Sequence, residues 1–132
     1  MRAFADTSFL YALAVERDPH HEEAVSSYET YEGEIWLTSY VLAETMSLLT
    51  KRRGKPGALS MGQRILAAAQ TRVIYPSAAD VAQAWDLFAA HPDWDFDLVD
   101  AISFAVMRRE GIETAFTLDR HFAQMGFAAV PE

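Results

Sequence analysis

The stretch "EIWLTSYVLAETMSLLTKRR", Glu34–Arg53, decides the fold class of this chain. Its first part, "EIWLTS", follows Gly33 and is rich in large and branched residues, which is typical of a β-strand. From Tyr40 onward the pattern is that of a helix with apolar residues on one face. A strand that continues directly into a helix is the unit from which parallel sheets are built.

The same alternation extends along the rest of the chain. Further short strands are expected at "RAFAD" (2–6), "RVIYP" (72–76), "TAFTLD" (114–119) and "FAAV" (127–130). Helices are expected over 9–15, 20–32, 61–70, 77–91 and 97–110, with a helical turn over 120–126 and a break at "GKPGALS" (54–60). Alternating strands and helices predict a parallel sheet with helices on both faces, which binds ligands outside the carboxyl ends of its strands.

Length and composition restrict the class of protein. A chain of 132 residues predicts one domain, 1–132, with enough residues for a proper core. The absence of cysteine excludes a disulfide framework and fits the cytoplasm. The N-terminus lacks the pattern of a secretory signal, and no stretch reaches the roughly 20 apolar residues of a membrane span. We therefore expect a cytoplasmic protein without a membrane segment.

The charge balance argues against binding of nucleic acid by charge alone. The formal net charge is -8, whereas such binding calls for a basic surface. The basic residues are nevertheless uneven, because "KRRGK" places Lys51, Arg52, Arg53 and Lys55 within five positions. This cluster is either a solvated helix end or a patch that contacts the phosphates of a nucleic acid.

Four aspartates lie where strands end or helices begin. Asp6 follows the first strand, Asp119 follows the "TAFTL" strand, and Asp97 and Asp100 lie at the start of the helix "DLVDAISFAVMRRE". Each has a purely structural explanation, because an aspartate at a helix start accepts a backbone N–H bond worth about 1 kcal/mol. Asp97 fits the N-cap position, and Asp100 then falls where a carboxylate suits the helix dipole.

Glu44 does not fit such an explanation. It is the only charged residue between Ile35 and Lys51, and its neighbours on the same helix face include Val41 and Leu48. A carboxylate on an apolar face is unfavourable by several kcal/mol unless it is paired, protonated or bound to a metal. The remaining structural alternatives are an exposed helix edge or a distant arginine partner.

Together these carboxylates indicate a metal site. Four carboxylates that converge above the sheet edge would repel one another, at about 4 kcal/mol per pair at 4 Å and an effective dielectric near 20. A cation would offset this repulsion, and with oxygen ligands and no cysteine the suitable ions are Mg²⁺ or Mn²⁺. Such ions hold phosphate oxygens and activate water for in-line attack on phosphorus.

The order of these motifs resembles a PIN domain. The motifs are "DTS" near the N-terminus, Glu44 in the helix after the second strand, "DAISFA", and "TLDRHF" near the end. Their placement and the chain length are similar to those of VapC-type toxin ribonucleases of toxin–antitoxin pairs.

The resemblance implies an activity and a set of site residues. It implies a three-layer α/β/α sandwich with a mostly parallel sheet, cleavage of RNA with Mg²⁺ or Mn²⁺, a cognate antitoxin and a homodimer. By position it implies that the ligands and catalytic acids are Asp6, Glu44, Asp100 and Asp119, that Asp97 is an accessory acid, and that Ser8 and Thr117 support the carboxylates.

Two other interpretations stay open at this point. One is a receiver-like signalling domain that binds Mg²⁺ and accepts a phosphoryl group, although such a domain requires adjacent acids after the first strand, and Asp6 follows Ala5. The other is a PIN-like scaffold without catalysis, in which the aspartates are helix caps alone. His121 could approach a phosphate, but no Ser or Cys nucleophile is placed to pair with it, so we leave it outside the predicted site.

Overall fold

A computed structural model describes residues 1–132 as a five-stranded sheet with helices on both faces. The strands are β1 (Arg2–Ala5), β2 (Glu34–Thr38), β3 (Thr71–Ile74), β4 (Thr114–Phe116) and β5 (Ala128–Val130). The helices are α1 (Thr7–Ala14), α2 (His21–Thr30), α3 (Ser39–Ala67), α4 (Ala78–Ala90), α5 (Leu98–Glu110) and α6 (Arg120–Gln124). The predicted α/β fold class is confirmed.

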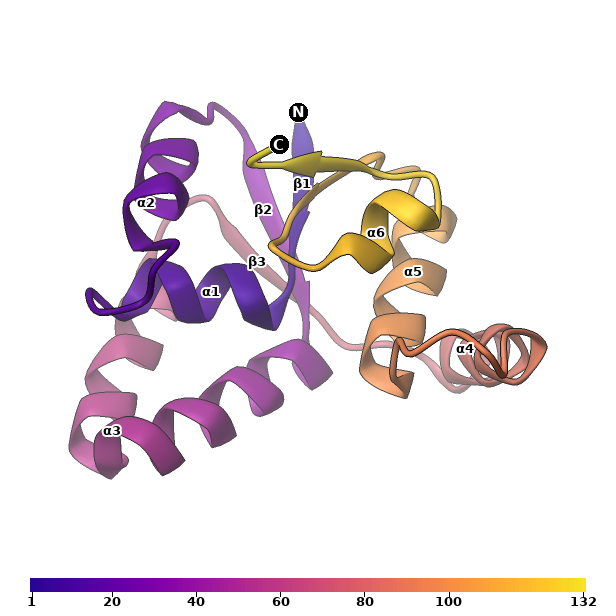
Figure 1. Cartoon of the computed structure of the whole chain (residues 1–132), viewed down its shortest axis with the longest axis horizontal. Coiled ribbons are helices and arrows are strands. Elements are labelled where there is room, and N and C mark those ends of the chain that lie inside the picture. The colour runs from indigo at the N-terminus through magenta and orange to yellow at the C-terminus, as the bar shows by residue number, and fades with distance from the viewer.

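The sheet is parallel throughout, in the order β3-β2-β1-β4-β5. Figure 1 shows α1, α2 and α3 on one side of the sheet, and α4, α5 and α6 on the other. The order reverses direction beside β1, because the chain builds outward to β3 on one side and to β5 on the other. Such a switch point opens a crevice at the carboxyl ends of the strands, and this crevice holds the site described below.

The short strand β1 is the centre of the core despite its plain sequence. Ala3, Phe4 and Ala5 are fully buried, because β1 lies between β2 and β4 and is covered on both faces. Aromatic side chains fill the space around it: Phe9 stacks on Phe116 with ring centroids 4.9 Å apart. The strand directly before Asp6 is therefore held rigidly.

The predicted chain break at 54–60 is shorter in the structure. Only Gly54 leaves the helical conformation, with φ of 78° and ψ of 160°, and the helix resumes immediately. Glycine adopts this positive φ without a steric penalty. Pro56 falls in the first turn after the kink, where a missing N–H is not needed, so the predicted loop is helical instead.

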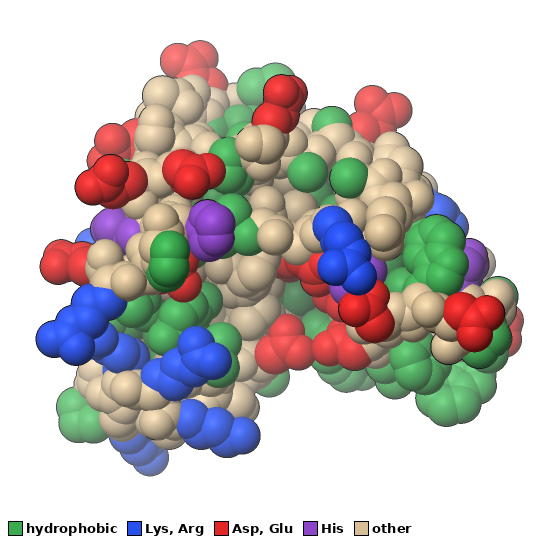
Figure 2. All heavy atoms as spheres, in the orientation of Figure 1, with side chains coloured by type: hydrophobic (Ala, Val, Ile, Leu, Met, Phe, Trp, Pro, Cys, Tyr) green, Lys and Arg blue, Asp and Glu red, His purple; other side chains and the backbone are tan.

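Two surface features complete the fold. None of the helices combines the length and apolar character that a membrane span requires. Trp85, Phe88 and Trp94 are exposed on α4 and on the loop that follows it, whereas Phe96 is buried in the core. Figure 2 shows hydrophobic side chains gathered over this α4 region.

Candidate metal centre

Five carboxylates line one cavity of about 470 Å³ at the carboxyl edge of the sheet: Asp6, Glu44, Asp97, Asp100 and Asp119. They come from the end of β1, from α3, from the start of α5 and from the connection between β4 and α6. Figure 2 shows acidic side chains gathered where the surface is hollowed between the α3 side and the α4 side. The structure thus brings together the predicted acidic residues, which are far apart in the sequence.

Hydroxyl groups hold the buried Asp6 carboxylate in place. Thr117 Oγ1 donates to Asp6 Oδ2 at 2.7 Å, and Ser8 Oγ donates to Asp6 Oδ1 at 2.7 Å. The Phe9 N–H also donates to Oδ1 at 3.0 Å, so Asp6 is the N-cap of α1. Asp6 therefore has a structural role and still faces the cavity, with its orientation fixed by Ser8 and Thr117.

Glu44 is fixed by a threonine that the sequence did not indicate. Thr7 Oγ1 donates to Glu44 Oε1 at 2.6 Å, and Thr45 Oγ1 donates to the Thr7 oxygen at 3.3 Å. Glu44 is half-buried and has no ion pair with Lys or Arg. The arginine-partner alternative is therefore wrong, and the carboxylate faces the other acids of the cavity.

The start of α5 carries two carboxylates in a reciprocal capping arrangement. Asp97 Oδ1 accepts from the Asp100 N–H at 2.9 Å, and Asp100 Oδ2 accepts from the Asp97 N–H at 3.2 Å. These bonds form a capping box, which agrees with the predicted N-cap at Asp97 and the predicted first-turn position of Asp100. Asp97 is exposed at the rim, whereas Asp100 is half-buried and points into the cavity.

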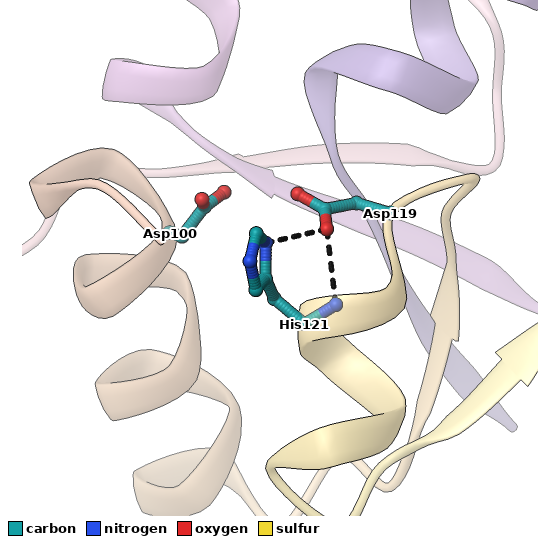
Figure 3. Close-up of side chains that lie close together, drawn as sticks. All are labelled: Asp100, Asp119 and His121. Carbon is teal, nitrogen blue, oxygen red and sulfur yellow. Dashed lines mark hydrogen bonds and ion pairs between the residues drawn. The ribbon is translucent and has the colours of Figure 1, made fainter. Parts of the chain in front are cut away.

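Asp119 completes the lining of the cavity, and His121 lies directly against it (Figure 3). Asp119 Oδ1 accepts from the His121 N–H at 3.0 Å and caps α6. The His121 ring lies against the same oxygen, with Nδ1 at 2.5 Å, and its Nε2 forms an ion pair with Asp95. His121 is buried, and together with Asp100 and Asp119 it offers atoms that all lie within 4.8 Å of one another.

The protonation of the site reflects a shortage of positive charge. Burial raises the pKa of Asp6 to about 6, against the lowering effect of the bonds from Thr117, Phe9 and Ser8. Burial and the charge of Asp97 raise the pKa of Asp100 to about 7. Burial alone would lower the pKa of His121, but Asp95 and Asp119 outweigh it and raise that pKa. The five carboxylates outnumber the basic groups beside them, which are Lys51 in the cavity lining and the His121 ring against Asp119.

Comparison with known proteins identifies the family. The family model described as "PIN domain" matches residues 3–128. The chain belongs to the PIN domain family. The resemblance inferred from the order of the motifs is therefore confirmed, and the receiver-like alternative is not supported.

A curated protein of nearly equal length is similar to this PIN domain. The chain is 35% identical over 127 residues to the 23S rRNA-specific endonuclease VapC20 of Mycobacterium tuberculosis, and the match covers 96% of both chains. The crystal structure of VapC20, described as a sarcin–ricin loop cleaving toxin, aligns with a TM-score of 0.89 at 33% identity, again over 96% of each chain.

More distant structures share the fold. VapBC2 from Rickettsia felis, bound to a DNA fragment from its promoter, aligns with a TM-score of 0.76 at 17% identity, covering 98% of this chain and 97% of that one. A toxin–antitoxin complex from Klebsiella pneumoniae aligns at 0.67 and 20% identity, covering 98% and 92%. At these identities the likeness concerns the PIN fold.

The residues of this PIN domain fit a divalent cation of the kind on which its family generally depends. All the side chains that line the carboxylate cavity offer oxygen, except for Lys51 and the apolar groups at its edge. Hard cations such as Mg²⁺ and Mn²⁺ prefer carboxylate oxygens, and binding favours the ionised form of each acid. Burial raises the pKa of Asp6 and of Asp100, and a cation bound between them would lower both values.

The basic cluster of this PIN domain divides into separate environments. Lys51 lines the edge of the acidic cavity. All four basic residues are exposed, and Arg52 lies over the ring of Tyr11, 5.1 Å from its centroid. Figure 2 shows Lys and Arg side chains gathered over the α3 side of the molecule. Contact of these residues with RNA stays a prediction.

Proposed function

We propose that this chain is a metal-dependent endoribonuclease and the toxin of a toxin–antitoxin pair, acting as one nuclease domain in the cytoplasm. The observation that supports it most strongly is the convergence of Asp6, Glu44, Asp100 and Asp119 in one cavity of a PIN domain. The similarity to an endonuclease over 96% of both chains supports the same activity.

In this proposal the four carboxylates hold Mg²⁺ or Mn²⁺, and the surrounding hydroxyls fix their orientation. A bound divalent cation supplies Lewis-acid stabilisation of the phosphodiester and lowers the pKa of water that attacks phosphorus. Ser8 and Thr117 hold Asp6, and Thr7 holds Glu44, so that the carboxylates need no rearrangement when they bind. Asp97 at the rim orients Asp100 through the helix cap.

The substrate of the proposed reaction is RNA. An acidic active site repels a polyanion, and the cation reverses the local charge where the phosphate must bind. Lys51 at the cavity edge, followed by exposed Arg53 and Lys55, would attract the RNA backbone on the α3 side. Ribosomal RNA is the first substrate to test, because VapC20 is named as a 23S rRNA-specific endonuclease.

An antitoxin is the protein partner that we propose. A second cavity of about 380 Å³ lies between α1, α2, α3 and the sheet, away from the carboxylates, and is lined mainly by apolar side chains such as Leu13, Val25 and Ile65. Apolar side chains of a partner could fill such a groove. We also propose a homodimer, for which the exposed aromatic residues Trp85, Phe88 and Trp94 offer an apolar surface.

The experiment that tests the activity is cleavage of ribosomal RNA by the wild type, Asp6→Asn and Asp100→Asn, with Mg²⁺ and with EDTA. We expect cleavage by the wild type with Mg²⁺ only, and a loss of at least about 100-fold in each variant, as for removal of groups that stabilise a transition state directly. Circular dichroism checks that each variant is folded. Cleavage that persists in EDTA, or in both variants, would contradict the proposed mechanism.

A further inference from the structure

We infer that His121, together with Asp95, is a positioning residue that fixes Asp119 relative to the start of α5. The inference deepens the proposed function, because it concerns the same carboxylate cavity and names two residues that hold its geometry. It rests on the contacts of the His121 ring, which joins two segments that lie 26 residues apart in the sequence.

The His121 side chain is enclosed and has a carboxylate at each ring nitrogen. The residue is 8% exposed, and its ring packs edge-on against Phe96 with centroids 6.2 Å apart. Nε2 contacts Asp95 Oδ1, and Nδ1 lies 2.5 Å from Asp119 Oδ1 as an ion pair. A buried imidazole between two carboxylates restricts the position of both.

This contact determines which Asp119 oxygen faces the cavity. Oδ1 of Asp119 is occupied by the His121 N–H at 3.0 Å and by the ring. Figure 3 shows the other carboxylate oxygen turned away from His121, on the side of Asp100. His121 thus selects the rotamer in which one oxygen of Asp119 remains available beside Asp100.

Through Asp95, His121 also holds the loop that leads into α5. Asp95 lies in the loop 91–97, two residues before the N-cap Asp97 of α5. Arg120 Nη2 also binds both Asp95 oxygens, at 3.3 and 3.2 Å, so two consecutive residues of α6 hold this loop. Because α5 begins directly after the loop, the separation of Asp100 from Asp119 depends on this connection.

Neither alternative role for His121 agrees with these contacts. A general acid needs a ring nitrogen that reaches the substrate, and both ring nitrogens already face carboxylates. For His121 to bind the cation, a ring nitrogen would have to give up its contact with a carboxylate such as Asp119. Because the ring lies close to Asp100 and Asp119, the experiment also tests this ligand role directly.

The test is a double-mutant cycle on Mn²⁺ affinity, measured by titration calorimetry on the full chain. The variants are His121→Gln, Asp95→Asn and their combination, with His121→Leu as the more drastic form and the exposed Asp93→Asn as a matched control in the same loop. We expect His121→Gln to weaken Mn²⁺ binding about 10-fold, His121→Leu up to about 100-fold, and Asp93→Asn to have no effect.

Coupling within the cycle separates positioning from general damage. We expect the combined variant to bind Mn²⁺ no more weakly than His121→Gln alone, because both changes interrupt one connection. Unchanged affinity in His121→Gln, additive losses, or losses that follow the fraction of unfolded protein in circular dichroism would overturn the inference. So would ¹⁴N coupling from His121 in pulsed electron paramagnetic resonance of the Mn²⁺ complex, which would make it a ligand.

The same experiment distinguishes this inference from the proposed function. A coupled loss of Mn²⁺ affinity without any RNA cleavage by the wild type would leave the positioning role intact and overturn the nuclease. If the wild type cleaves RNA with Mg²⁺, but His121→Gln and His121→Leu bind Mn²⁺ as the wild type does, the nuclease is supported and the positioning role is overturned.

Discussion

Two buried aspartates of this protein have opposite electrostatic surroundings. Asp6 is 4% exposed and Asp80 is 3% exposed, and each accepts backbone or hydroxyl hydrogen bonds at a helix start. Arg109 binds both oxygens of Asp80, at 2.6 and 3.0 Å, and holds its pKa below the usual range. Asp6 has only hydroxyl and amide donors, and its pKa is about 6.

The difference distinguishes a carboxylate with a structural role from a carboxylate that binds an external cation. Burial disfavours the ionised form of both residues, and only Asp80 receives a cation from the chain itself. The neighbours of Asp6 in the cavity include more carboxylates, which increase the imbalance. A group of carboxylates that includes a buried member without a cationic partner, as Asp6 is, therefore indicates an external cation.

The largest effect on stability is expected at the paired site. Asp80→Ala removes the capping box with Ser77 and the bidentate contact with Arg109, so the free energy of unfolding should fall by about 2–4 kcal/mol. Asp6→Asn should leave stability at pH 8 unchanged or higher, because it removes a charge that burial disfavours. Urea denaturation measures both values.

One outcome of the denaturation experiment would contradict this prediction. If Asp6→Asn lowered the free energy of unfolding as much as Asp80→Ala does, both aspartates would stabilise the fold in the same way. The exposed Asp93→Asn serves as the control for removal of one acidic charge from this acidic chain.

A smaller effect is expected at Lys51, which lies at the edge of the cavity. Lys51→Ala should raise KM for RNA several-fold, leave kcat nearly unchanged and reduce the dependence of binding on salt, because one phosphate contact is lost. Lys55→Ala removes the same charge beyond the kink at Gly54, outside the cavity, and should have a smaller effect on KM. Equal effects of the two variants would indicate general charge attraction without a defined contact.

Local patterns predicted most of the fold and the acidic residues of the site. The strand–helix alternation is visible in segments such as Glu34–Arg53, and the aspartates stand at the ends of strands, so their meeting at one sheet edge follows from topology. The isolated Glu44 could be recognised because its apolar neighbours offered no partner.

The unpredicted features depend on contacts between distant segments. The bond from Thr7 to Glu44 joins residues 37 positions apart, and the contact of His121 with Asp95 joins residues 26 positions apart. Neither has a spacing that a sequence pattern reveals. The continuation of α3 beyond Gly54 was missed because "GKPG" has the composition of a loop, although Pro56 suits a first helical turn.

The measurement that tests the central claim most directly is thermal unfolding from pH 5 to pH 8, with EDTA and with Mg²⁺. The folded pKa values of Asp6 and Asp100, about 6 and 7, exceed the unfolded value of 3.8, so the folded state binds more protons than the unfolded state in this range. Stability without metal should therefore fall as pH rises from 5 to 8, by about 1 kcal/mol from Asp6 alone, because part of its contribution is already lost below pH 5. Groups with lowered pKa values, such as Asp80, lose their contribution only at lower pH.

Asp80→Asn and Asp6→Asn separate an effect of Mg²⁺ at the carboxylate cavity from an effect elsewhere in the protein. Mg²⁺ should stabilise the wild type and Asp80→Asn strongly at pH 8 and weakly at pH 5, and should have little effect on Asp6→Asn at either pH. A wild-type protein whose stability rises from pH 5 to pH 8 in EDTA, or whose gain from Mg²⁺ is the same in Asp6→Asn, would contradict the claim that these carboxylates require a cation.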